Sequence, residues 1–195
     1  DVCTEASIKK AVMEMVSKGL DPRKKQCYPI VYGKALTIQP SYFGNQRVAR
    51  TYNPKLSEFH AQVILKGDDY QTDIAPDGRK YLVKHVQKFG TERTLENIVG
   101  AYSVVRIGYD EKGNPIYDLD DMLKSQMERA WAKNPFAGKT HKEFSEEMCK
   151  KTIISRHAKR WANASDDSAV VDDDNDDYDE ETPVDIDNDG LEPID

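Results

Sequence analysis

Cysteine, histidine and long apolar runs are scarce in this sequence, and each scarcity excludes a class of protein. The 195 residues include only three cysteines, Cys3, Cys27 and Cys149, which form no CxxC pair and no Cys/His cluster. The sequence therefore indicates neither a disulfide framework nor a zinc site. No apolar run approaches the roughly 20 residues that a membrane span needs, and no signal peptide is recognisable. We therefore expect a protein of the reducing cytoplasm without a membrane attachment.

Basic residues are absent from the last part of the chain. Residues 165–195 contain 15 Asp and Glu and neither Lys nor Arg. The net charge of −7 for the whole chain therefore hides an uneven distribution of charge. Residues 1–164 therefore hold 28 basic and 20 acidic residues, a net charge of +8. A basic body with an acidic tail predicts a polyanionic partner, with the tail as a competitor; a soluble basic domain with a solubilising tail is the alternative. We predict one domain over 1–164 and a disordered tail over 165–195, because the tail can bury too little apolar area to offset its ordering entropy.

The signatures of nucleotide hydrolysis and metal catalysis are incomplete. Gly138-Lys139-Thr140 resembles the end of a P-loop, but the position five before Gly138 is Lys133, and a predicted helix precedes it where a strand is needed. Several acids fall beside predicted turns or at a helix start, where they cap and complement the helix dipole: Asp68, Asp69, Asp118, Asp120 and Asp121. A metal-dependent nuclease is possible but is not indicated. The sequence thus predicts a protein that is not an enzyme and needs no cofactor.

Helix and strand signals alternate in blocks along the chain. Helices are predicted over 4–18, 42–50, 120–133 and 140–164, and strands over 27–32, 35–39, 56–65, 70–74, 80–88, 98–109 and 115–119. On the first helix one face is apolar and consists of Ile8, Ala11, Val12, Met15 and Val16. Strand groups mixed with segregated helices indicate an α+β domain, in which antiparallel hairpins and a small sheet pack with helices.

The stretch 27–50 combines a hairpin with a basic helix. Gly33-Lys34 separates two aromatic and β-branched runs, Pro40 cannot donate to a sheet, and Ser41 can cap the helix that follows. That helix has a polar, positive side and two residues that can pack inward, Phe43 and Val48. Its polar residues are Asn45, Gln46, Arg47 and Arg50. The residues alone leave a functional surface and a plain scaffold equally open.

The last predicted helix carries a second charge pattern. One arc is apolar and is predicted to face the core: Phe144, Met148, Ile154, Ala158 and Trp161. Lys142, Arg156 and Arg160 cluster on the other side, with Lys159 at the margin, while Lys151 falls inside the apolar arc and must snorkel or meet an anion. Basic residues on a rigid helix suit sequence-tolerant binding of single strands, although a solvated helix face is the alternative.

Two segments resemble the RecT/Redβ family of phage single-strand annealing proteins. The first holds Tyr-x-x-x-Tyr-Gly at 28–33, Leu-Thr-Ile-Gln at 36–39, Tyr42, Gly44 and Ala49-Arg50. The second is Glu-Met-Cys-Lys-Lys-Thr at 147–152 with Arg156, similar to that family's E-M-x-K-K-T segment. The two lie about 110 residues apart in the family's order, so the resemblance covers roughly residues 6–164. The chain departs from the family pattern at Pro40-Ser41 and at His157-Ala158.

The resemblance implies ATP-independent binding of single-stranded DNA and annealing of complementary strands in phage homologous recombination. It also implies a homo-oligomer, as a ring or helical filament, that holds the annealed duplex intermediate. Expected partners are a phage exonuclease and the host single-strand-binding protein. Because family members usually carry more helix before this point, we expect 1–164 to lack part of its native N-terminus. A plain single-strand-binding protector and a metal-dependent nuclease are the rival functions.

Eight residues are the predicted DNA contacts. The family motifs and the charge patterns favour phosphate contacts at Arg47, Arg50, Lys150, Lys151, Arg156 and Lys159. Tyr42 is predicted to touch a base or sugar, although it could equally be a core residue. Lys84, on a predicted strand, belongs either to a basic strip over a groove or to a sheet edge guarded by lysines.

Overall fold

The computed structural model describes residues 3–132 and 143–162. The elements in chain order are α1 (Glu5–Ser17), the 3-10 turn η1 (Pro22–Lys24), β1 (Cys27–Tyr32), β2 (Ala35–Pro40), α2 (Tyr42–Tyr52), β3 (His60–Leu65), β4 (Asp69–Ile74), β5 (Lys80–Val86), β6 (Ile98–Tyr109), β7 (Pro115–Leu123), α3 (Lys124–Trp131) and α5 (Ser145–Ala162). The P-loop-like segment 138–140 and the acidic tail lie outside the described residues, so their predicted structures stay predictions.

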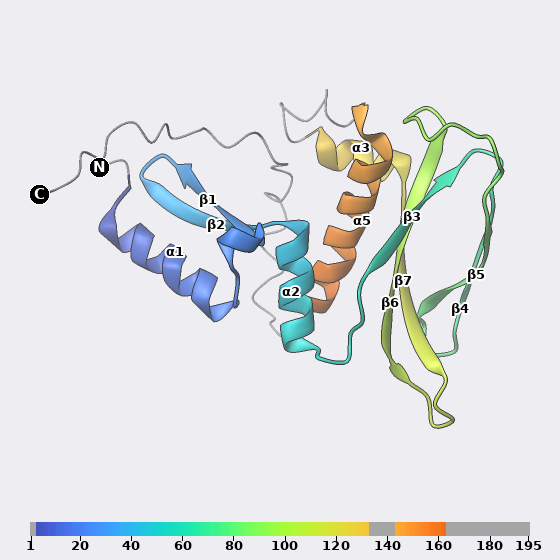
Figure 1. Cartoon of the computed structure of the whole chain (residues 1–195), viewed down its shortest axis with the longest axis horizontal. Coiled ribbons are helices and arrows are strands. Elements are labelled where there is room, and N and C mark those ends of the chain that lie inside the picture. Colours follow the sequence, from blue (N-terminus) through green and yellow to red (C-terminus); the bar gives the residue numbers. More distant parts are fainter. Residues whose placement is uncertain (1–2, 133–142, 163–195) are drawn as a thin grey trace, which may run out of the picture.

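The elements follow one another along the long axis of the molecule (Figure 1). α1 and the β1–β2 hairpin lie at one end, α2 and α5 lie side by side in the middle, and the antiparallel sheet, in the order β3-β6-β7, follows. The β4–β5 hairpin forms the other end and is a separate two-stranded sheet. This is the predicted α+β fold, with hairpins and a small sheet packed against helices. None of the described helices is long and apolar enough to cross a membrane.

The first helix begins and ends as predicted, but its apolar face is only half covered. Thr4 accepts a hydrogen bond from the Ser7 amide, and Gly19 adopts the left-handed conformation that ends the helix. Of the predicted apolar face, Ala11 is buried and Met15 packs against the core, whereas Ile8, Val12 and Val16 are exposed. α1 packs on β2, and among the described residues these three side chains stay outside that contact.

The hairpin and the basic helix are confirmed, with two corrections. The Ser41 hydroxyl caps α2 by accepting from the Gly44 amide, and the helix continues to Tyr52. Phe43 is exposed instead of packed inward, and Asn45 and Gln46 are buried. α2 lies between the hairpin and α5, so part of its polar side faces protein; the Asn45 side chain donates to the Ser155 hydroxyl of α5.

A long strand replaces the predicted start of α3. β7 continues through Asp120 and Asp121 to Leu123, because its antiparallel pairing with β6 extends to Gly100 opposite Leu123. These acids are therefore strand residues and do not cap a helix. A register shift between Gln71 and Thr72 also breaks the predicted alternation in β5, since Lys84 is exposed while Leu82 faces inward.

α5 is buried on two faces. Ala158 and Ala162 pack with Val48 and Ala49 of α2 in one core, while a second face enters the core beneath the sheet. That second face consists of Met148, Cys149 and Ile153. The apolar arc predicted from periodicity describes only part of this burial, and its first member, Phe144, is exposed.

Candidate nucleic-acid interface

Basic side chains gather in two regions of the described chain. We call the first the α2 pocket, a cavity of about 240 Å³ lined by Lys24, Gln26, Phe43, Arg47 and Arg50. We call the second the β7 groove, a cavity of about 860 Å³ between β7, the β4–β5 hairpin and α5. They differ in what stands beside each positive charge.

The α2 pocket exists because the chain before β1 lies against the first turn of α2. Ser41 holds this contact through its amide, which donates to the Gln26 carbonyl at 3.0 Å, and its hydroxyl, which donates to the Lys25 carbonyl at 2.6 Å. A Cβ at Gly44 would lie 1.9 Å from the Gln26 carbonyl oxygen. Only glycine permits this approach, which brings Lys24 beside the basic face of α2.

The α2 pocket has three cations in its lining and no carboxylate. Arg50 donates from Nη2 to the Gln46 side chain at 3.2 Å, but its Nε is buried and has no hydrogen-bond partner among the described residues. A buried unpaired donor costs about 1–3 kcal/mol, so such a group is expected to meet a ligand. The Phe43 ring, 46% exposed, stands in the same lining. Cations around an exposed aromatic ring suit a nucleotide, with phosphate on the arginines and a base on the ring.

Tyr42 and Lys151 lie next to this pocket. The Lys151 ammonium is 5.8 Å from the centroid of the Tyr42 ring, a cation–π contact between α5 and α2. The Tyr42 and Phe43 rings are 4.0 Å apart between centroids. The Lys151 ammonium therefore lies beside the Tyr42 ring, which in turn lies beside the Phe43 ring.

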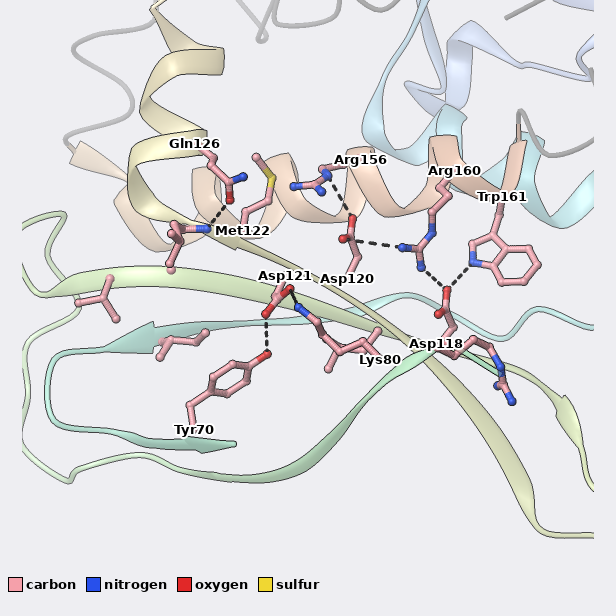
Figure 2. A pocket seen from close by; sticks show the side chains of 17 residues that line it. Tyr70, Lys80, Asp118, Asp120, Asp121, Met122, Gln126, Arg156, Arg160 and Trp161 are labelled. Atoms are coloured by element: carbon pink, nitrogen blue, oxygen red, sulfur yellow. Dashed lines mark hydrogen bonds and ion pairs between the residues drawn. The ribbon is translucent and has the colours of Figure 1, made fainter. Parts of the chain in front are cut away.

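The β7 groove presents carboxylates between its cations (Figure 2). Arg156 and Arg160 point from α5 toward β7, while Lys80 approaches from the β4–β5 hairpin. Arg156 pairs with Asp120 at 3.3 Å, Lys80 pairs with Asp121 at 2.7 Å, and Arg160 pairs with both Asp118 and Asp120. Lys80, Arg156 and Arg160 are thus each matched by a carboxylate of β7, while Arg79 pairs with Asp77 of its own hairpin.

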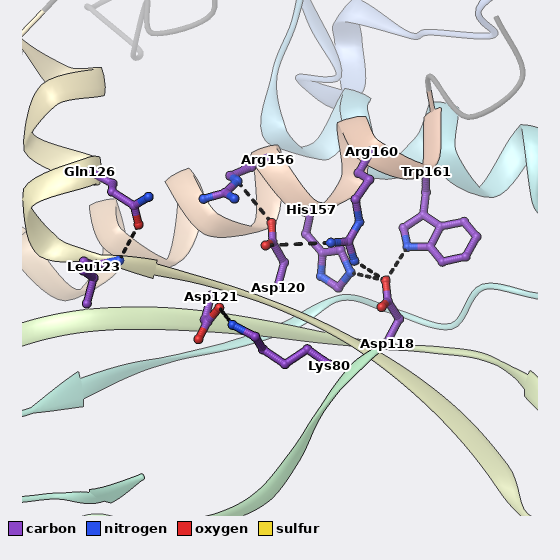
Figure 3. Close-up of polar contacts among 10 residues, drawn as sticks. All are labelled: Lys80, Asp118, Asp120, Asp121, Leu123, Gln126, Arg156, His157, Arg160 and Trp161. Atoms are coloured by element: carbon purple, nitrogen blue, oxygen red, sulfur yellow. Dashed lines mark hydrogen bonds and ion pairs between the residues drawn. The ribbon is translucent and has the colours of Figure 1, made fainter. Parts of the chain in front are cut away.

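Asp118 is the most densely bonded of these acids (Figure 3). One carboxylate oxygen accepts from His157 Nε2 at 3.0 Å, from Trp161 Nε1 at 2.9 Å and from the Arg160 guanidinium. Burial alone would raise the pKa of Asp118, but the His157 hydrogen bond and the Arg160 charge outweigh it, so this pKa lies below its usual value. The cluster ties the end of α5 to β7. Sequence reasoning missed it, because the partners lie about 40 residues apart and an isolated His and Trp carry no spacing signal.

The remaining predicted contacts do not join either region. Lys84 pairs with Asp69 on the β4–β5 hairpin, and Lys150 pairs with Glu146 one turn earlier on α5 at 2.6 Å. Lys159 is half-buried on α5. The structure thus brings together Arg47 and Arg50, with Tyr42 and Lys151 adjacent. Lys24 and Phe43 also line the α2 pocket, and neither is among the eight predicted contacts.

Within the described residues, no group of three or more His, Cys, Asp or Glu side chains is arranged to hold a metal ion.

Comparison with known proteins adds one finding. No curated protein matches the chain at the similarity required. A model of the RecT family matches residues 1–186, which includes both segments that carry the resemblance.

Proposed function

Because the chain belongs to the RecT family, whose members anneal single strands in DNA recombination, we propose that it binds single-stranded DNA through the α2 pocket and anneals it to a complementary strand. The observation that carries this proposal is the unpaired positive charge of that pocket. Phosphates lie against Lys24, Arg47 and Arg50, and the buried Arg50 Nε donates to one of them. No bond is made or broken, and no nucleotide is hydrolysed.

The exposed Phe43 ring takes a base in this proposal. Base–aromatic stacking is sequence-tolerant because every base has a π-face, which suits a protein that must accept any sequence. Tyr42 contacts both the Lys151 ammonium and the Phe43 ring and holds them beside the bound DNA strand. Lys151 and Lys159 extend the phosphate path along α5. Lys84, Lys150 and Arg156 each pair with a carboxylate, so they contribute less than Arg47 and Arg50.

We further propose a homo-oligomer, as a ring or filament, that passes DNA from one subunit to the next and holds the annealed duplex. The exposed apolar side chains of α1 support this, since large apolar side chains gathered on one exposed helix suit contact with another protein surface. They are Ile8, Val12, Met13 and Val16. A phage exonuclease that exposes the strand and the host single-strand-binding protein are the proposed partners, in the bacterial cytoplasm.

An annealing assay with labelled complementary strands tests the proposal. Added without nucleotide, the protein should accelerate pairing, whereas a protector would slow it and a nuclease would degrade the strands when magnesium is added. Arg47→Ala with Arg50→Ala should weaken single-strand binding at least about tenfold, because charge-assisted hydrogen bonds contribute about 1.5–3 kcal/mol each. The slope of log affinity against log salt should fall by about 1.4, at about 0.7 for each phosphate contact.

The matched control is Lys55→Ala with Lys112→Ala, which removes the same charge from exposed positions outside both regions. If the control weakens binding as much as the arginine pair, net charge and not the α2 pocket determines affinity. If the arginine variant keeps its affinity and slope, the pocket is not the DNA site.

A further inference from the structure

We propose that the β7 groove binds this chain's own acidic segment, 163–195, as an extended strand added to the edge of β7. This docking does not require the annealing activity, and it would hold if the α2 pocket bound no DNA. Three features of the described residues carry it: a strand edge, two half-exposed guanidiniums beside that edge, and the place where the described chain ends. The composition of the segment that follows is the fourth.

The free edge is visible in the pairing of the sheet. β7 is hydrogen-bonded to β6 on one side only, and residues 118–123, six in a row, line the groove. At the two ends of this stretch the outer edge is met by side chains: Arg79 donates to the Tyr117 carbonyl, and the Leu123 amide donates to Gln126 at 2.9 Å. Backbone groups alternate sides along a strand, so Leu119 and Asp121 between them also turn their amides and carbonyls away from β6.

The hydrogen bonds of Arg106 support this assignment of which β7 backbone groups point away from β6. Arg106 lies opposite Tyr117, yet its backbone amide and carbonyl bond to Ser57, on the side of β6 away from β7. Among the described residues, no backbone hydrogen bond joins β7 to β5, although the two strands are in contact. Leu119 and Asp121 therefore offer a short ladder to an incoming strand, the geometry of β-augmentation.

The walls favour an acidic strand. Arg156 and Arg160 keep side-chain exposures of 47% each while they pair with Asp120 and Asp118. A guanidinium has five donors, and these ion pairs leave some of them directed to the opening. The lining holds four cations and three carboxylates, and Arg79 also pairs with Asp77, so an incoming acidic strand meets the remaining donors of Arg156 and Arg160 on the α5 wall.

The chain leads directly from the groove into such a strand. α5 runs antiparallel to β7, since Arg156 meets Asp120 and Arg160 meets Asp118. The described residues therefore end beside Asp118, at Ala162, one residue after the Trp161 that bonds it. A segment that turns back there runs parallel to β7 and passes Arg160 before Arg156.

Length and composition both suit this path. The 33 residues of 163–195 exceed what is needed, because five extended residues already span roughly 17 Å. Residues 168–174 then place two β-branched side chains, Val170 and Val171, ahead of three aspartates. Tethering keeps the segment at an effective concentration on the order of millimolar, so weak contacts suffice.

Hydrogen–deuterium exchange of the full chain tests this docking. Val170→Pro with Val171→Pro removes two backbone donors and keeps every charge, so it should abolish the added strand without touching the folded domain. We expect exchange of the Leu119 and Asp121 amides, within residues 117–123, to become at least about tenfold faster than in the unsubstituted chain. Val184→Pro with Ile186→Pro, farther along the segment, is the control and should leave exchange unchanged.

Three outcomes would overturn the proposal. Equal exchange over 117–123 in the unsubstituted chain and the Val170/Val171 variant means that no strand from 168–174 lies there. Protection that rises with protein concentration means that a second copy supplies the strand. Protection that appears only on adding an oligothymidylate, and equally in both variants, assigns the groove to DNA.

Discussion

The α2 pocket and the β7 groove contain the same kinds of cation but differ in what neutralises them. Arg47 and Arg50 stand in a lining without a carboxylate, whereas Arg156 and Arg160 each face an aspartate of β7. Binding of a nucleic acid draws on charges that can release counterions to phosphate. The difference teaches that the number of lysines and arginines on a helix does not identify its DNA contacts, because the acids that the fold places opposite them decide which charges are available.

The two regions also differ in role: the β7 groove stabilises the fold, and the α2 pocket is the proposed binding site. In the groove, the Asp118 carboxylate accepts from three side chains of one helix turn and so fixes α5 on the sheet. In the pocket, the Arg50 Nε is buried and has no hydrogen-bond partner in the described part of the chain, a cost to the folded state that a bound phosphate would remove. The predictions below test this division.

The largest expected effect is on stability, in the groove. Asp118→Ala leaves the His157 and Trp161 donors without their acceptor, at about 1–3 kcal/mol for each, and removes one partner of the half-exposed Arg160, so a loss of about 3–5 kcal/mol is expected. Denaturant titration of this variant should show that loss, while Glu111→Ala, an exposed turn acid, should change stability by less than about 0.5 kcal/mol. A loss as small as the control's would mean that the cluster does not hold α5.

A smaller loss is expected where the pocket is built. Gly44→Ala forces the chain at Gln26 away from α2, and overpacking of this kind costs about 1–3 kcal/mol although alanine is the better helix former. Lys24 would be displaced with it, so single-strand affinity should fall as well. Gly108→Ala is the control, since a Cβ there meets no atom within 4 Å. Unchanged melting and affinity in the Gly44 variant would show that the approach is not required.

Acid should weaken the groove cluster through Asp118. Its pKa in the fold lies below the unfolded value of about 3.9, so the stability it contributes is present above that value and is lost as the pH falls through the lower, folded pKa. Asp118→Asn should therefore flatten the dependence of unfolding free energy on pH below about pH 4. Denaturant melts at several acidic pH values measure this. An equally steep dependence in the variant would assign acid sensitivity to other carboxylates.

Local signals predicted the pocket better than the groove. Gly33, Pro40 and the Ser41 cap act within a few residues of themselves, so the hairpin, the turn and the start of α2 could be found from sequence. The extension of β7 through Asp120 and Asp121 could not, because it depends on pairing with β6, and aspartate is a poor strand former. The burial of His157 likewise depends on an acid 39 residues away, and the exposure of Phe43 depends on which side of α2 the hairpin covers.

The finest comparison sets one arginine of each region against the other. Both Arg47 and Arg156 were predicted from sequence as phosphate contacts, and each is exposed on a helix. Arg47→Ala should lower the slope of log affinity against log salt by about 0.7, the value of one phosphate contact on a single strand. Arg156→Ala should lower it by less than about half of that, because Asp120 already takes the place of a phosphate.

A second variant tests whether the ion pair with Asp120, and not the position of Arg156 on α5, keeps this arginine from binding DNA. Asp120→Asn releases Arg156 from its ion pair, so if the carboxylate alone restrains this arginine, the slope should become steeper than in the unsubstituted protein. Affinity titrations at four or more salt concentrations resolve these differences, with circular dichroism as a check that each variant folds. Equal slope changes in Arg47→Ala and Arg156→Ala would mean that Arg156 leaves Asp120 and contacts a DNA phosphate when DNA binds. The β7 groove would then belong to the strand's path, and charge pairing in the free protein would not distinguish the two regions.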